Sequence, residues 1–238
     1  MGIQPRPAFR DYWALKPSYK HTPWYHAAMK RERFEAIHST MLHCSATEAE
    51  SVQKIAPFMN SLLKNFQAAF YPWQNLSLDE MVIGWKGRFK YRQFNAAKPK
   101  KFHIKMFGLC NSTTGYTYNL LGYFGSERAY DPESDPDGES AIRVFQTLLT
   151  PLIKGHHIFA DRYYTTRNLV DYLLCRHVYY TFTVQSNRRG FPAEMKTLKL
   201  NNREKKYFMN ETSEALVIMW RNKKAKTPCL MVSTNTNW

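Results

Sequence analysis

The chain has 238 residues, 44% hydrophobic and 15% aromatic, which excludes a disordered chain and is enough to build a buried core. No uninterrupted apolar run approaches the roughly 20 residues that span a bilayer, so a membrane-spanning protein is excluded as well. Lysine and arginine number 34 against 19 acidic residues, and this net charge of +15 favours a polyanionic partner, most commonly nucleic acid. Solubility alone is the alternative, but the basic residues cluster, which favours binding.

The four cysteines are dispersed and form no CxxC pair, which argues against a disulfide framework and against a zinc knuckle. We expect Cys44, Cys110, Cys175 and Cys229 to be buried thiols of a protein in a reducing compartment. The first residues lack the apolar segment of a secretory signal.

The first part of the chain divides into an arm and a helical segment. Prolines and aromatic residues predict an extended arm over residues 1–25. Apolar spacing then predicts helices over 26–44 and 52–70, although Pro57 conflicts with the second unless the helix starts or kinks there. We therefore predict a helical subdomain over residues 26–75.

The period changes to that of β-strands at Leu76. Strands are predicted at 76–85, 102–110 and 116–124, and their short connections predict antiparallel pairing. The acidic segment Asp131–Glu139 is predicted to be a solvated loop, because the spacing of a calcium-binding loop is missing. Ser140 is expected to cap the helix that follows, and Gly155 to close it.

A helix over 141–153, a strand over 156–161, a helix over 168–177 and a strand over 179–184 complete the order βββαβαβ. Residues 190–238 contain two further predicted strands, 215–220 and 229–233, around the basic turn Arg221–Lys226. This last part is interpreted as a partial β-rich segment that follows a core over residues 76–189.

Two aspartates come together if this topology is right. The crossover helix should return the chain to a strand parallel to the first, which would place Asp161 beside Asp79. Two carboxylates on neighbouring strands suit Mg²⁺, although a complete site normally has a third. Taken singly, Asp79 could instead be an N-cap or pair with Lys86 or Arg88, and Asp161 could be a helix cap.

Basic residues follow Asp79 closely and are candidates for contacts with DNA phosphates, which are independent of sequence and sensitive to salt. The predicted DNA-binding residues are Lys86, Arg88, Lys90, Arg92, Lys98, Lys100, Lys101, Lys105, Arg188 and Arg189, and Arg221–Lys226 could extend them. The interleaved aromatics Phe89, Tyr91, Phe94 and Phe102 could stack on unpaired bases, but we expect them to lie in the core.

Two long segments resemble the catalytic signatures of the piggyBac transposase family. LSLDEMVIGWKGRFKYRQFNAAKPKKFHIK, from Leu76, is similar to the first, and IFADRYYTTRNLVDYL, from Ile158, to the second. DYW at 11–13, MKRERFEAIHSTMLH at 29–43, KIAPFMNSLLKNF at 54–66 and VQSNRRGFP at 184–192 also resemble the family, in the same order.

This resemblance implies an α/β (α+β) fold with a ribonuclease-H-like mixed sheet and flanking helices. It also implies an Asp-Asp-Asp triad, Mg²⁺ dependence and cut-and-paste movement of DNA into TTAA targets. Asp79 and Asp161 match the first two catalytic, metal-binding positions, and Arg162 replaces the usual Asn. The third Asp of the family lies in a Gly-Gly-Val-Asp-like stretch, and neither this stretch nor the cysteine-rich zinc module occurs by Trp238.

The leading expectation is a nuclear, DNA-binding, transposase-derived protein that has little or no cleavage activity as this chain alone. A domesticated DNA-binding protein without catalysis is the alternative. The expected partners are transposon-end and target DNA, with a homodimer as an option and no membrane.

Overall fold

The structure is a computed structural model that describes residues 9–14, 24–41, 52–125, 139–152, 154–210 and 215–234. The chain forms two compact units, Met1–Leu62 and Leu63–Trp238. Cys44 and the predicted acidic loop, apart from Glu139, lie outside the described residues. The predicted boundaries at 25, 75 and 189 stay predictions.

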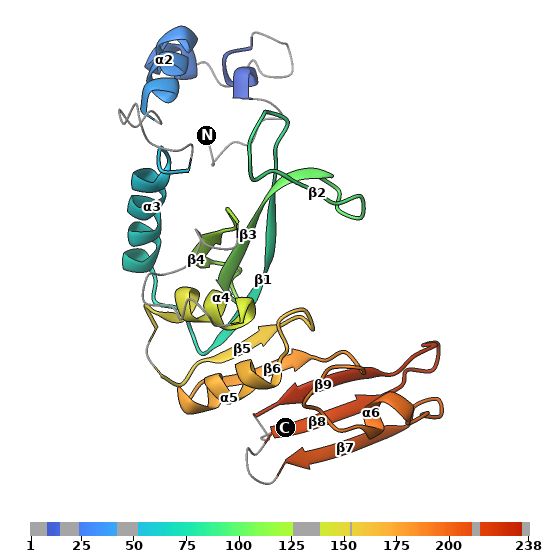
Figure 1. Ribbon diagram of the computed structural model, residues 1–238. Coiled ribbons are helices and arrows are strands. Elements are labelled where there is room, and N and C mark those ends of the chain that lie inside the picture. The colour runs from blue at the N-terminus through green and yellow to red at the C-terminus, as the bar shows by residue number, and fades with distance from the viewer. Residues whose placement is uncertain are drawn as a thin grey trace. The chain divides into compact units, whose positions relative to one another are not determined.

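The second unit is built on one mixed sheet (Figure 1). Its strands are β1 Asn75–Gly84, β2 Gln93–Phe94, β3 Phe102–Asn111, β4 Thr117–Gly122, β5 His157–Ala160, β6 Tyr179–Thr183, β7 Lys205–Asn210, β8 Ala215–Trp220 and β9 Cys229–Ser233. Its order is β2-β3-β1-β5-β6-β9-β8-β7. β4 also pairs with β3, along Met106–Cys110, beyond the residues that pair with β2. With α4 Ser140–Leu149 and α5 Arg167–Cys175, the predicted order βββαβαβ is confirmed, apart from the short added β2.

The pairing of the first strands follows the prediction. β1 runs antiparallel to β3, and β3 antiparallel to β4, while β1, β5 and β6 run parallel. The sheet is therefore mixed, and the fold class predicted from the resemblance is confirmed.

The core lies between this sheet and its two helices. Leu76 and Leu78 of β1 alternate with exposed or half-exposed residues, as a strand with one buried face requires. Phe145 of α4 and Leu169 of α5 are fully buried in the same cluster. α4 begins at Ser140 itself, after Glu139, which makes no side-chain cap, and it ends at Leu149, before the predicted end.

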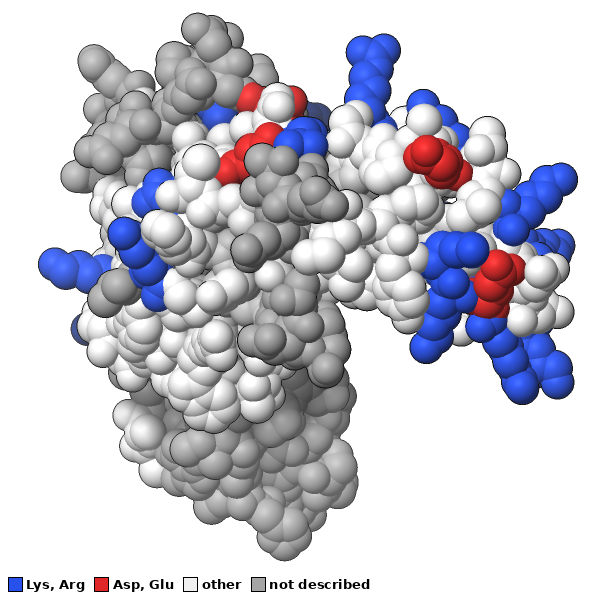
Figure 2. All heavy atoms as spheres, turned by 90° about the horizontal axis from the view of Figure 1, so that it is seen from below, with Lys and Arg blue, Asp and Glu red and all other residues white. Residues whose placement is uncertain are grey.

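The last three strands extend the same sheet. β9 pairs antiparallel with β6, and β8 and β7 follow outward, so the segment after residue 190 is continuous with the central sheet. β7 and α6 Glu194–Thr197 were not predicted. Figure 2, seen from below, shows basic side chains gathered on the right, where β7–β9 lie in Figure 1.

Helix α3 spans Ala56–Ala69, so Pro57 is its second residue. The first helical turn tolerates proline, because its backbone N–H groups have no partner within the helix. The conflict seen in the sequence is thereby resolved. None of the helices in the described part of the chain has the length and apolar character that a membrane span requires.

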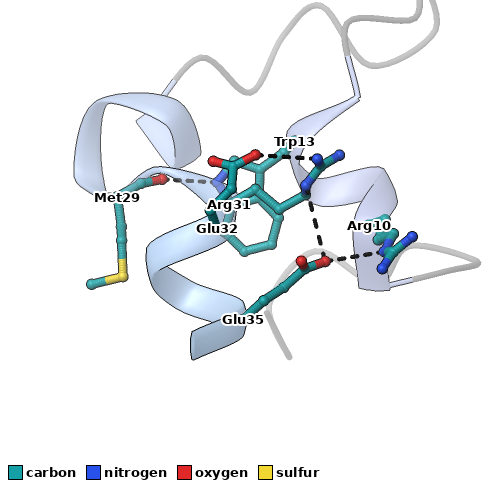
Figure 3. Close-up of polar contacts among 6 residues, drawn as sticks. All are labelled: Arg10, Trp13, Met29, Arg31, Glu32 and Glu35. Carbon is teal, nitrogen blue, oxygen red and sulfur yellow. Dashed lines mark hydrogen bonds and ion pairs between the residues drawn. The ribbon is translucent and has the colours of Figure 1, made fainter. Parts of the chain in front are cut away.

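The described part of the first unit is helical. It contains η1 Phe9–Trp13, α1 Trp24–Ala28 and α2 Arg31–Met41. The Trp13 indole N–H donates to the Met29 carbonyl at 2.8 Å, and Glu35 contacts Arg10 and Arg31 at 3.0 and 4.0 Å (Figure 3). The expectation of an extended arm is therefore wrong at residues 9–13 and 24–25, where Tyr12, Trp13 and Tyr25 are buried against one another.

The prediction of buried thiols is also wrong. Cys175 and Cys229 are exposed, because they lie at the end of α5 and the start of β9, and Cys110 is half-buried. All three described cysteines are free of disulfides.

Gly155 precedes β5 and has φ +96°, a conformation that is strained for residues with a Cβ. A Cβ there would meet no atom within 4 Å, so only the backbone opposes substitution. We expect Gly155→Ala to lower the free energy of unfolding by about 1–2 kcal/mol. Gly155→Asn should lose less, because Asn tolerates the left-handed region better. Equal stability of both variants and the unaltered chain in urea denaturation would refute the assignment of strain.

Candidate catalytic site

Asp79 in β1 and Asp161 directly after β5 lie at equivalent positions of two adjacent parallel strands. Leu78 of β1 pairs with Ala160 of β5, and the next residue on each strand is the aspartate. Adjacent strands lie about 4.8 Å apart, and both carboxylates are exposed. The topology that the sequence predicted is confirmed, while the catalytic role of the pair stays a prediction.

The structure removes the alternative roles of both residues. Asp79 lies within β1 and is no helix cap, and among the described residues it makes no ion pair with Lys86 or Arg88. Its Oδ1 accepts from the backbone N–H of Glu80 at 2.7 Å. Helix α5 is capped by Thr166, whose side chain accepts from the Leu169 N–H, so Asp161 is not its cap.

The Asp161 carboxylate is oriented by its surroundings. Its Oδ1 accepts from the Arg162 N–H at 2.6 Å and from the Thr183 hydroxyl at 3.0 Å. The Thr183 hydroxyl also accepts from the Arg162 N–H at 2.8 Å, so the three groups form a closed ring of hydrogen bonds. Thr183 ends β6, the parallel neighbour of β5, which places it opposite Asp161.

We expect Thr183→Val to weaken Mn²⁺ binding at this site by about tenfold, the lower end of the cost of losing a group that orients a metal ligand. Valine keeps the shape of threonine but cannot donate to Asp161. Thr183→Ser keeps the hydroxyl and should retain most of the affinity. Free Mn²⁺ measured by electron paramagnetic resonance checks this, and equal affinities of the Val and Ser variants would contradict it.

Glu80 points to the other face of β1 and has a different partner. Its carboxylate pairs with the ammonium of Lys105, which is only 14% exposed. Lys105 also lies near the rings of Phe107, Tyr123 and Tyr163, at 4.8, 5.6 and 5.0 Å from their centroids. This enclosure differs from the free phosphate-binding lysine that the sequence predicted at position 105.

Tyr164 lies in the core beneath the carboxylates, and its hydroxyl is buried without a hydrogen-bond partner among the described groups. Burial raises its pKa strongly, and the negative charges of Glu80, Asp79 and Asp161 raise it further. The phenol therefore stays neutral and adds no charge beside the carboxylate pair.

The donor set fits a hard divalent cation in part. Within the described ranges, no group of three His, Cys, Asp or Glu side chains is placed to hold a metal ion. Mg²⁺ is commonly bound through one or two carboxylates, with waters and substrate phosphates completing the shell. Asp79 and Asp161 are two such ligands by chemistry and by position.

The segment between β1 and β3, residues 85–101, is called here the basic hairpin. It projects beyond the end of β5, because β1 continues past Asp79 to Gly84, about 17 Å along the strand (Figure 1). Exposed cations along it are Lys86, Arg88, Lys90, Arg92, Lys100 and Lys101, with Lys98 half-buried.

The aromatic residues in and next to the basic hairpin were expected in the core, but they lie outside it. Phe94 and Phe102 are 61% and 48% exposed and contact each other at 5.0 Å between centroids. The Arg92 guanidinium lies 4.5 Å from the Phe102 ring. Phe89 and Tyr91 are half-buried in a small cluster with Phe124.

Further basic residues line the edge of the sheet at which β5 and β6 end and past which β1 continues, called here the carboxyl edge. Arg188 and Arg189 follow β6, and the former donates to the carbonyls of Arg162 and Tyr163 at 2.8 and 3.1 Å. Because β8 runs parallel to β6, the basic turn 221–228 lies at the same edge, with Lys223, Lys224 and Lys226 exposed.

Thr183 was not predicted from the sequence, although the parallel register would have placed a residue at the end of β6 opposite Asp161. The Lys105–Glu80 pair was not predicted either, and its signal was strand alternation, which sets Glu80 on the opposite face to Asp79. The position of Tyr163 in the turn after β5 had no such signal.

Comparisons with known proteins identify the family of this chain. The family model described as transposase IS4 matches residues 1–237. The chain is 25% identical over 236 residues to human PiggyBac transposable element-derived protein 2, covering 94% of this chain and 38% of that protein. It is 27% identical over 173 residues to human PiggyBac transposable element-derived protein 3, covering 70% and 28%. The chain thus spans well under half the length of these two relatives.

A solved structure gives the same fold. A cryo-EM structure of the piggyBac transposase synaptic complex with hairpin DNA superposes with a TM-score of 0.75 at 20% identity, covering 90% of this chain and 45% of that one. The chain therefore belongs to the transposase IS4 family and is a piggyBac-type transposase-like protein with a ribonuclease-H-like fold.

Proposed function

We propose that this protein binds DNA along the carboxyl edge of its sheet and holds a phosphate of that DNA at Asp79 and Asp161 for Mg²⁺-dependent cleavage and strand transfer. The observation that carries the proposal is the in-register carboxylate pair at an edge that also carries the exposed cations Arg189, Lys223, Lys224 and Lys226. Two carboxylates alone would repel a phosphate. Binding of the phosphate therefore requires a metal cation between it and the carboxylates, and basic residues on either side.

The path of the DNA follows from where the cations lie. On one side β1 continues about 17 Å past Asp79 to Gly84, immediately before the basic hairpin, and this length corresponds to about five phosphates along one strand of a duplex. On the other side the carboxyl edge continues from β5 past β6, β9 and β8 to β7, about 19 Å at the usual strand spacing. Both lengths suit phosphate contacts on the two sides of one reacting phosphate.

The residues have separable roles in this scheme. Mg²⁺, when bound, would neutralise the phosphate and lower the pKa of a bound water or of a 3′-hydroxyl. Asp79 and Asp161 would hold the ion, and Thr183 would fix the orientation of Asp161. The exposed lysines and arginines would position the strands without reading their sequence.

Support from the relatives is indirect, because the chain matches only part of their length. The matched structure is a transposase bound to hairpin DNA, which supports DNA as the partner. A nuclear location and assembly as a homodimer belong to the same proposal, since chromosomal DNA is the substrate and transposition joins two ends.

The second candidate is DNA binding without cleavage. It is favoured by the observation that two carboxylates, and no group of three metal-binding side chains, come together among the described residues. Both candidates require the same basic surface, so they differ only in what Asp79 and Asp161 do.

The test is a salt titration of affinity for a labelled duplex, followed by incubation of the complex with Mg²⁺. The proposal expects log Kd to rise linearly with log salt, with a slope of about 0.9 for each phosphate contacted. Nicking that requires Mg²⁺ and is lost in Asp79→Ala supports cleavage and overturns the expectation that this chain alone has little or no activity. Binding without nicking fits both candidates, and Mn²⁺ binding that is lost in Asp79→Ala then favours the first. Salt-independent or absent binding would overturn both.

A further inference from the structure

Tyr163 is an exposed aromatic residue two positions after Asp161. Its side chain is 55% exposed, whereas its neighbour Tyr164 is 1% exposed and lies in the core. The two rings meet edge to face at 5.1 Å and 90°, so the buried ring supports the exposed one. An exposed tyrosine held in this way, two residues from a candidate metal ligand, calls for a functional explanation.

The ring is held by a charged group as well. The Lys105 ammonium lies 5.0 Å from the Tyr163 centroid, within the range of a cation–π contact. Lys105 is itself fixed by Glu80 and by the rings of Phe107 and Tyr123, and it is only 14% exposed. A partly dehydrated cation contributes more to such a contact than an exposed one does.

The backbone of Tyr163 is fixed too. The Tyr164 N–H donates to the Asp161 carbonyl at 3.1 Å, which closes a turn around Arg162 and Tyr163. The Arg188 guanidinium donates to the carbonyls of both turn residues at 2.8 and 3.1 Å. The position of the exposed ring is therefore set before any ligand arrives, which lowers the entropy cost of binding.

We infer that Tyr163 is a base-stacking residue, which receives an unpaired nucleobase adjacent to the phosphate at Asp79 and Asp161. This inference rests on the proposed function and deepens it. An aromatic face binds any base and is tolerant of sequence. A base inside an intact duplex is already stacked, so the ligand class is DNA with unpaired nucleotides, as at an overhang or a frayed end.

The test compares two oligonucleotides, a blunt duplex and the same duplex with a single-stranded overhang that contains 2-aminopurine. Tyr163→Ala is expected to weaken binding of the overhang DNA by roughly tenfold, within the loss reported for one base–aromatic stack, and to relieve the quenching of 2-aminopurine. Affinity for the blunt duplex should stay unchanged. Tyr163→Phe keeps the ring and should behave as the unaltered chain.

Tyr179 supplies the matched control, because it is 47% exposed and lies at the start of β6, the opposite end of the sheet. Tyr179→Ala should leave both affinities unchanged. Lys105→Gln, which can still donate to Glu80, should weaken overhang binding alone, because Lys105 acts through the Tyr163 ring. A direct phosphate contact by Lys105 would instead weaken both DNAs and flatten the salt dependence.

Equal affinities of Tyr163→Ala and the unaltered chain for overhang DNA would overturn the stacking role while leaving the proposed function intact. Equal losses on the blunt and overhang DNAs would overturn it as well. Absence of binding to either DNA by the unaltered chain would overturn the proposed function, and the stacking role with it.

Discussion

Replacing Asp79 and Asp161 together by asparagine is expected to abolish binding of Mn²⁺ at the carboxyl edge, while affinity for DNA is retained or rises. The loss should exceed the roughly 10–100-fold that removal of an orienting group costs, because both charged ligands disappear. DNA affinity should not fall, because the two removed charges repel phosphates and lie within a Debye length of about 10 Å at 0.1 M salt.

The matched control is Glu32→Gln with Glu194→Gln, which removes two negative charges from exposed side chains elsewhere. It should leave Mn²⁺ binding unchanged. Electron paramagnetic resonance gives the free Mn²⁺, and fluorescence anisotropy gives DNA affinity on the same samples. Unchanged Mn²⁺ binding in the Asp79 and Asp161 double variant would rule out these residues as metal ligands.

Neutralising Lys98, Lys100 and Lys101 together is expected to weaken DNA binding by up to about 500-fold at 0.1 M salt and to flatten the salt slope by about 2.7. Each contacted phosphate releases a counterion and contributes about 0.9 to the slope, so three contacts give these values. Lys98 is half-buried, and a smaller effect of that residue would show as a slope change nearer two.

The control variant removes three exposed cations that lie away from the carboxyl edge: Lys64 on α3, Lys154 before β5 and Arg176 after α5. Because it removes the same charge, it measures the effect of net charge alone. Its salt slope should match that of the unaltered chain. Equal losses in the two triple variants would mean that overall charge, and not the basic hairpin, binds DNA.

The part of the fold that the sequence predicted is the part with strong local patterns. The alternation in β1 and the apolar faces of α4 and α5 are set by burial on one side, so their elements and order could be inferred. Right-handed crossover then placed Asp161 beside Asp79 without any contact being visible in the sequence.

The errors arise where tertiary contacts override local composition. Prolines near Tyr12 and Tyr25 predicted an extended arm, but these aromatic residues bury one another in helical turns. Phe94 and Phe102 were expected in the core because they are apolar, yet both are exposed and pack against each other at the base of the basic hairpin. Lys105 was counted with its basic neighbours, although alternation turns it toward Glu80.

The central claim is that Asp79 and Asp161 share one cation next to bound DNA. Crystals of the chain with a short overhang duplex and Mn²⁺, measured by anomalous diffraction at the manganese edge, test it most directly. We predict an anomalous peak about 2.1 Å from a carboxylate oxygen of each aspartate, with a DNA phosphate oxygen in the same coordination shell. Bound DNA with no such peak between the two carboxylates would contradict it.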